Sequence, residues 1–162
     1  TYHFAHIIDD HFMGTTHVVR GEEWPATLNI HLQLFRTMGW KAPKYVHTAQ
    51  LMKMDGGSKR KLSKRKDPEL ALDFYNAEGY PVPSVLEYLM TLLNSNFEDW
   101  RRANPTAPMG DFQFTTKKMG NSGSLFDIDK LKDVSKNTIS VMSADQVYDE
   151  VTAWAKDFDP QL

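Results

Sequence analysis

The N-terminal part of the sequence alternates between strand-like and helix-like patterns, and this alternation limits the fold more than any other feature. Tyr2 to Ile8 and Thr16 to Val19 are rich in aromatic and β-branched residues, which is typical of strands. Glu22 to Met38 has apolar residues at helical spacing, a proline in its first turn and Gly39 at its end. Lys44 to Thr48 predicts another strand. A strand, helix, strand order is typical of half of an open α/β sheet.

The sequence changes character after Lys66. Prolines separate apolar helical segments there, and strand-like runs nearly disappear. Val85 to Leu93 contains a wide apolar stripe, and a further helix is expected around Asp127 to Val134. The fold class predicted from these patterns is α/β followed by mainly α.

The last helix is predicted from its first turn. Ser143 and Gln146 have the spacing of a capping box, in which each side chain bonds the backbone of the other residue. The helix is expected to bury three apolar residues: Val147, Val151 and Trp154. We expect this helix to begin another domain.

The composition limits the class of protein. With 162 residues, 41% of them hydrophobic and 12% aromatic, the chain can bury a core and is unlike a disordered segment. Its formal net charge of -2 argues against a globally basic nucleic-acid-binding protein, so we expect no DNA partner. The sequence has no cysteine, no recognisable signal peptide and no apolar stretch near the roughly 20 residues of a membrane span. We therefore expect a cytoplasmic protein without a membrane partner.

The densest basic run is Lys59 to Lys66, which follows Asp55-Gly56-Gly57-Ser58. We expect the glycines to make the backbone mobile, so that several cations close over a polyphosphate. A basic octamer by itself is more often a solvated loop or a nuclear-localisation-like run. The order of residues favours the phosphate-binding interpretation over the solvated loop. The second signature of class I aminoacyl-tRNA synthetases, in its glutamyl form, is matched letter for letter by Lys61-Leu62-Ser63-Lys64-Arg65.

The chain resembles bacterial-type glutamyl-tRNA synthetases over essentially its whole length. Two upstream runs, Tyr2 to His11 and Met13 to Trp24, are similar to the stretch that lines the glutamate and ATP pocket of this family. Four short downstream segments are similar to its stem-contact region: Leu72 to Tyr75, Glu78 to Tyr80, Phe126-Asp127 and Lys130-Leu131. The resemblance implies the C-terminal half of a Rossmann-like catalytic domain in residues 1–66, a helical stem-contact region in 67–142 and the start of an anticodon-binding domain in 143–162.

The resemblance also implies roles for individual residues. Tyr2, His6 and Arg20 would face the amino-acid substrate, and an arginine fork suits a carboxylate. ATP would be bound by six residues: Glu23, Trp24, Lys61, Ser63, Lys64 and Arg65. Lys61 and Lys64 would be the catalytic residues, because they would hold the phosphates. Without the resemblance, Arg20 would be read as a surface ion pair and Trp24 as a packing residue.

A metal site near the N-terminus is a weaker interpretation. His3, His6, Asp9, Asp10 and His11 lie close together in sequence, but on a strand His3 and His6 would point to opposite faces. We expect no protein-bound metal, and Mg²⁺ only in complex with ATP as a substrate. The aspartates are equally suited to a turn or a helix cap.

The reaction implied by the resemblance joins glutamate to ATP and then transfers the glutamyl group to the 3' end of tRNA. The sequence lacks the His-Ile-Gly-His signature that shares the ATP site, begins without methionine, and carries an additional Lys59-Arg60 pair. We expect a piece of a longer protein that is inactive alone. The alternatives are a glutaminyl enzyme, the glutamyl-queuosine relative that modifies tRNA, and a non-catalytic RNA-binding module.

Overall fold

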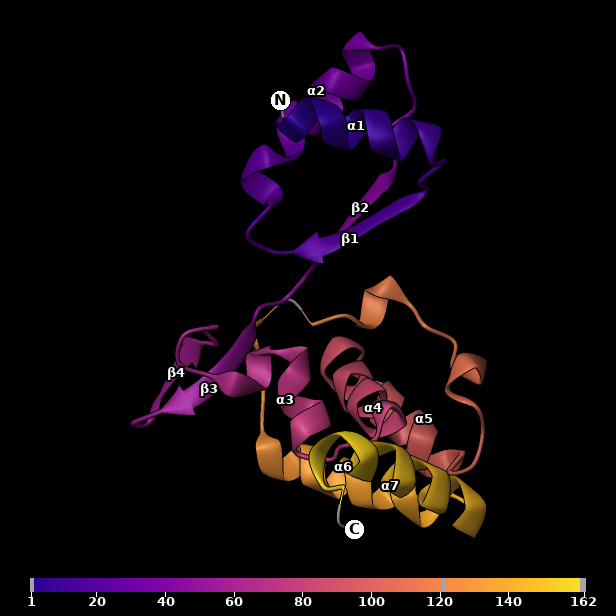
Figure 1. Ribbon diagram of the computed structural model, residues 1–162. Helices are drawn as coiled ribbons and strands as arrows, with labels where there is room; N and C mark the ends of the chain where they lie inside the picture. Colours follow the sequence, from indigo (N-terminus) through magenta and orange to yellow (C-terminus); the bar gives the residue numbers. More distant parts are fainter. Residues whose placement is uncertain (1, 121, 161–162) are drawn as a thin grey trace. The chain divides into compact units, whose positions relative to one another are not determined.

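The computed structural model describes residues 2–120 and 122–160, which divide into two compact units, Thr1–Gln50 and Leu51–Leu162 (Figure 1). The division lies before residue 66, where the sequence suggested a boundary. The basic run therefore belongs to the second unit, since its Leu62 packs into the core of that unit. No helix in the described part of the chain is long and apolar enough to cross a membrane.

The first unit is built on a parallel pair of strands. The strands β1 (His17–Gly21) and β2 (Lys44–Thr48) pair from His17 with Lys44 to Gly21 with Thr48, and the helix α2 (Pro25–Thr37) connects them. Gly39 adopts a φ of 70° just beyond α2, which only glycine adopts without strain. The predicted strand, helix, strand order is confirmed, and α2 begins at Pro25 instead of Glu22.

The prediction of a strand over Tyr2 to Ile8 is wrong, because residues Tyr2–Phe12 form the helix α1. The helix packs against α2 and buries Ile7 completely. His6 and Asp10, one turn apart on α1, approach to 3.2 Å. Tertiary packing of one helical face thus outweighs the local strand preference of aromatic and β-branched residues.

The second unit begins with a hairpin that the sequence reading missed. The strands β3 (Leu51–Asp55) and β4 (Ser58–Lys61) are antiparallel, and β3 also pairs with β5 (Ser124–Leu125) in parallel. Gly56 and Gly57 form the two-residue turn with φ angles of 55° and 87°, as the tight turns of hairpins require. The glycines that were expected to make the backbone mobile thus form the turn of a paired hairpin.

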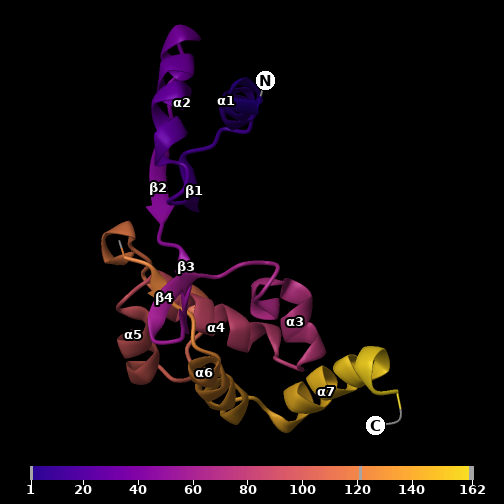
Figure 2. The ribbon, with the colours of Figure 1, turned by 90° about the vertical axis from the view of Figure 1, so that its left-hand side faces the viewer.

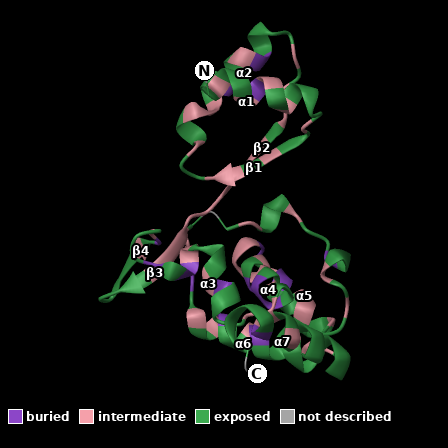
Figure 3. Ribbon diagram, viewed as in Figure 1, coloured by how far each residue is buried: buried purple, intermediate pink, exposed green. Residues whose placement is uncertain are grey.

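The rest of the second unit is helical, as expected (Figure 2). Its elements are η1 (Pro68–Leu70), α3 (Leu72–Ala77), α4 (Val82–Leu93), α5 (Phe97–Ala103), η2 (Met109–Asp111), η3 (Thr116–Lys118), α6 (Ile128–Ser140) and α7 (Ala144–Phe158). The core residues come from α3, α4, α6 and the segments beside β4 and β5: Leu62, Tyr75, Val85, Tyr88, Phe126 and Leu131. Most of the buried positions lie in the second unit, several of them on α4 and α6, and fewer lie in the first unit (Figure 3).

The capping box of α7 is confirmed. Ser143 Oγ accepts from the Gln146 backbone N–H at 3.2 Å, and Gln146 Oε1 accepts from the Ser143 N–H at 2.9 Å. The burial prediction for this helix is wrong at Val151, which is 46% exposed, whereas Ala155 is buried. Trp154 is partly buried and donates from its indole to the Asn76 carbonyl at 2.8 Å.

The apolar stripe of α4 is also only partly buried. Val85 and Tyr88 lie in the core, whereas Leu86 and Leu89 are exposed. The stripe is wider than the face that α6 covers, so its outer positions remain at the surface.

Candidate functional site

The first unit gathers polar and aromatic side chains around Arg20, at the C-terminal end of β1. Arg20 Nε donates to His47 Nε2 on β2 at 3.2 Å, and Arg20 Nη1 lies 3.1 Å from His31 Nδ1 on α2. The guanidinium carbon lies 4.8 Å from the ring centre of Tyr45 and 5.7 Å from that of Trp24. Parallel pairing of β1 and β2 brings Arg20 and His47 together, because they are register partners.

Tyr2 and His6 join this cluster because α1 is a helix. Residues four positions apart lie on one helical face, and the two rings stack at 6.3 Å with 11° between their planes. Tyr2 also stacks on Trp24 at 5.7 Å. Four of the residues predicted to meet substrates, namely Tyr2, His6, Arg20 and Trp24, are therefore neighbours within the first unit.

The histidines are arranged differently from the sequence expectation. His3 and His6 share a face of α1 and both approach His31, His3 through a 2.9 Å contact between Nδ1 and Nε2 and His6 through ring centres 4.6 Å apart. His31 is fully buried, and burial together with the neighbouring His6 and Arg20 lowers its pKa from 6.5 to about 4. Among residues 2–120 and 122–160, no group of three or more His, Asp or Glu side chains is arranged to hold a metal ion.

Glu23 occupies a separate position from this cluster. Its side chain is exposed, and its carboxylate folds back against Gly21, where any side chain at that position would collide with it.

The signature run of the second unit leaves β4 and enters a turn. Leu62 is buried in the core, and the backbone closes through Lys66 and Asp67 N–H groups that both donate to the Ser63 carbonyl at 2.9 Å. The charged side chains of Lys61, Lys64 and Arg65 are exposed, and none makes an ion pair with a residue that the structure describes. One buried leucine thus anchors a turn whose cations are free to meet an anion.

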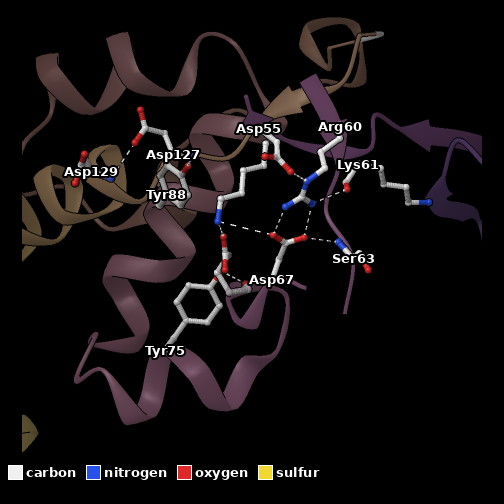
Figure 4. A network of polar contacts seen from close by, with 11 residues as sticks. Asp55, Arg60, Lys61, Ser63, Asp67, Tyr75, Tyr88, Asp127 and Asp129 are labelled. Atoms are coloured by element: carbon white, nitrogen blue, oxygen red, sulfur yellow. Dashed lines mark hydrogen bonds and ion pairs between the residues drawn. The ribbon is translucent and has the colours of Figure 1, made fainter. Parts of the chain in front are cut away.

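Arg60 has a different role, although it lies in the same basic run (Figure 4). Its guanidinium donates to both Asp67 carboxylate oxygens at 2.7 and 2.8 Å and to Asp55 at 2.6 Å. These bonds raise the pKa of Arg60. Together with the Ser63 N–H, which donates to Asp67 at 2.8 Å, they hold the pKa of Asp67 well below its usual value. Lys53 approaches Asp67 to 3.8 Å and bonds Glu69. Arg60 is therefore an internal counterion.

The sequence reading missed Asp67, His31, His47 and Tyr45. Asp67 follows the signature directly, and an acidic residue beside a basic run was the signal that could have revealed it. No local signal identifies His31, whose role depends on side chains from α1, β1 and β2 that contact its ring.

Comparison with known proteins decides the family. A family model described as the catalytic domain of class I tRNA synthetases (E and Q) matches residues 1–133. The chain belongs to this family. The synthetase match extends well into the helical part of the second unit and includes every residue predicted to bind a substrate.

Similar sequences in this synthetase family are glutamate–tRNA ligases. The ligase of Acetivibrio thermocellus is 58% identical over 162 residues, which are all of this chain and 30% of the relative. The ligase of Clostridium beijerinckii is 55% identical and is covered to 29%. The chain thus spans about 30% of the length of the relatives that it matches.

Solved synthetase structures share the fold. The glutamate–tRNA synthetase of Elizabethkingia anophelis superposes with a TM-score of 0.74 at 28% identity, over 97% of this chain and 34% of that one. A glutamate–tRNA ligase of Elizabethkingia meningosepticum, solved in complex with its amino acid, gives 0.76 at 29% identity and the same coverage. The predicted α/β and helical class, with a Rossmann-like catalytic part, is confirmed.

Proposed function

We propose that the chain is part of a glutamate–tRNA ligase, which activates glutamate with ATP and transfers it to the 3' end of tRNA. The observation that carries this proposal is the contrast within one basic run, where Lys61 and Lys64 are exposed and unpaired among the described residues while Arg60 is neutralised. The names of the similar proteins support glutamate as the amino acid.

In this proposal the cluster around Arg20 binds the amino acid. The guanidinium meets a carboxylate, the Tyr2 hydroxyl and His6 orient the substrate, and Trp24 offers its indole to the ATP nucleoside together with Glu23. The stacking of Tyr2 on Trp24 supports the assignment, because it links Tyr2 to the indole that lies beside Arg20.

The signature turn binds the phosphates of ATP, which arrives with Mg²⁺ as a substrate complex. Lys61 and Lys64 stabilise charge that develops as the glutamate carboxylate attacks the α-phosphate, and Ser63 and Arg65 complete the contacts. No protein base is needed, since attack depends on positioning and on charge. We assign tRNA stem contacts to residues 67–142 and the start of an anticodon-binding domain to residues 143–162, in a cytoplasmic enzyme.

Pyrophosphate exchange tests the proposal. A full-length protein that contains this chain should exchange pyrophosphate into ATP when glutamate and tRNA are present, and glutamine should not replace glutamate. The isolated chain should fold without activity, because it lacks the His-Ile-Gly-His signature. A full-length protein without exchange contradicts the ligase assignment, and exchange by the isolated chain contradicts the need for both signatures.

A non-catalytic RNA-binding module is the second candidate, because the same exposed cations suit a phosphate backbone. ATP binding separates the two. The ligase binds ATP, and Lys64→Ala weakens that binding, whereas the module binds RNA in a salt-dependent manner and binds no ATP.

A further inference from the structure

We propose that His31 and His47 are positioning residues that hold Arg20 through neutral acceptors, so that its full charge and two of its N–H groups remain for the substrate carboxylate. The inference rests on the proposed function of the Arg20 cluster. Both contacts lie within the first unit, on α2 and β2.

The chemistry of arginine fixes the protonation of its neighbours. A guanidinium only donates, so His31 Nδ1 and His47 Nε2 must both be free of hydrogen to accept from it. Neutral His31 then carries its hydrogen on Nε2 and donates it to His3 Nδ1 at 2.9 Å. The hydrogen bonds thus run in one direction, from Arg20 through His31 to His3.

The number of donors also fits a carboxylate. Arginine has five N–H groups, and three are directed at protein acceptors: one at His47, one at His31 and one, at 3.5 Å, at the Trp24 carbonyl. Two N–H groups remain, which is the number that a bidentate carboxylate takes. Arg20 makes no ion pair with any described residue, so its charge is uncompensated within the described chain.

The surroundings keep both histidines neutral. The titratable and charged groups that face His31 come from α1, β1 and β2: His3, His6, Asp10, Arg20 and Tyr45. Burial is the largest cause that lowers the pKa of His31, and burial with the nearby Arg20 also lowers the pKa of His47. At neutral pH both rings therefore accept from Arg20 without adding charge of either sign.

Three substitutions at His31 distinguish two roles of this residue. One role is to hold the Arg20 guanidinium with an acceptor, and the other is to leave the positive charge of Arg20 uncompensated. His31→Asn retains an acceptor near Nδ1 and no charge, His31→Asp retains an acceptor but adds a negative charge, and His31→Phe removes the acceptor. In the full-length ligase, we expect His31→Phe and His31→Asp each to raise the KM for glutamate about 10- to 100-fold. His31→Asn should restore most of the affinity, and the KM for ATP should stay unchanged in all three.

His47 provides the second test, because it is only partly buried and tolerates substitution better. His47→Gln keeps an acceptor near Nε2 and should stay close to the parent protein, whereas His47→Leu should raise the KM for glutamate. His17→Asn is the matched control, since His17 is an exposed residue of β1 whose ring lies 3.0 Å from Thr16 Oγ1. Thermal unfolding of each variant identifies those that fail to fold.

The outcomes are distinct. Wild-type glutamate affinity in a folded His31→Asp or His47→Leu variant overturns the inference, as does an equal loss of affinity in the Asn, Asp and Phe variants. A parent protein that activates no glutamate contradicts the proposed function itself.

Discussion

Arg20 and Arg60 each have a guanidinium held by two side chains, yet their partners differ in charge. Neutral histidines hold Arg20, whereas the carboxylates of Asp55 and Asp67 hold Arg60. Carboxylates cancel the charge that they bind, so Arg60 fixes the hairpin to the turn and offers little to an external anion. Neutral acceptors fix Arg20 and leave its charge available. The partners of a cation, more than its place in a basic run, therefore indicate its role.

The largest effect is expected at a cation without any partner among the described residues. Lys64→Ala in the full-length ligase should slow adenylate formation about 100-fold or more and change glutamate affinity little, because its contact strengthens in the transition state. Pyrophosphate exchange at saturating ATP and glutamate measures this. Lys59→Ala is the control, because Lys59 is equally exposed on β4. An unchanged rate for Lys64→Ala would remove the signature turn from the mechanism.

Acidification should weaken the first unit through His31. The pKa of His31 is about 4 in the folded chain and 6.5 when exposed, so the unfolded chain binds more protons between these values. The contribution of neutral His31 to the free energy of unfolding is fully present above about pH 6.5. The free energy of unfolding then falls by up to about 3 kcal/mol as the pH drops to about 4. Hydrogen exchange of α2 amides across this range tests it. His31→Asn should flatten the dependence, and an equal slope in that variant would show that other groups cause it.

The same conservative substitution at the two arginines tests the comparison directly. Arg20→Lys keeps the charge and loses the planar fork, so the KM for glutamate in the full-length ligase should rise about tenfold or more. Glutamate dependence like that of the parent protein would show that Arg20 makes only structural contacts.

Arg60→Lys should have the smallest effect on catalysis. Because the carboxylates of Asp55 and Asp67 hold the Arg60 guanidinium, the KM values for ATP and glutamate and the rate of adenylate formation should stay within about threefold in the folded variant. A loss as large as that of Lys64→Ala would mean that Arg60 contacts ATP and that its pairing with Asp67 is broken in the active state.

Local patterns predicted the elements whose cause is local. The capping box of α7 was predicted correctly because Ser143 and Gln146 satisfy backbone groups within one turn. Gly39 ends α2 because it alone adopts a positive φ freely. The signature run was likewise identified from its order of residues, which is visible in the sequence without knowledge of any tertiary contact.

Tertiary contacts decided the rest. Aromatic and β-branched residues at Tyr2 to Ile8 prefer strands locally, but burial of Ile7 against α2 makes them helical. That helix brings Tyr2 and His6 to Arg20, which a strand would not do. The sequence by itself identified the family and its cations. Only the fold determined which cations are neutralised, because it brings the carboxylates of Asp55 and Asp67 onto Arg60. It also gives Arg20 neutral partners that are distant in the chain, His31 and His47.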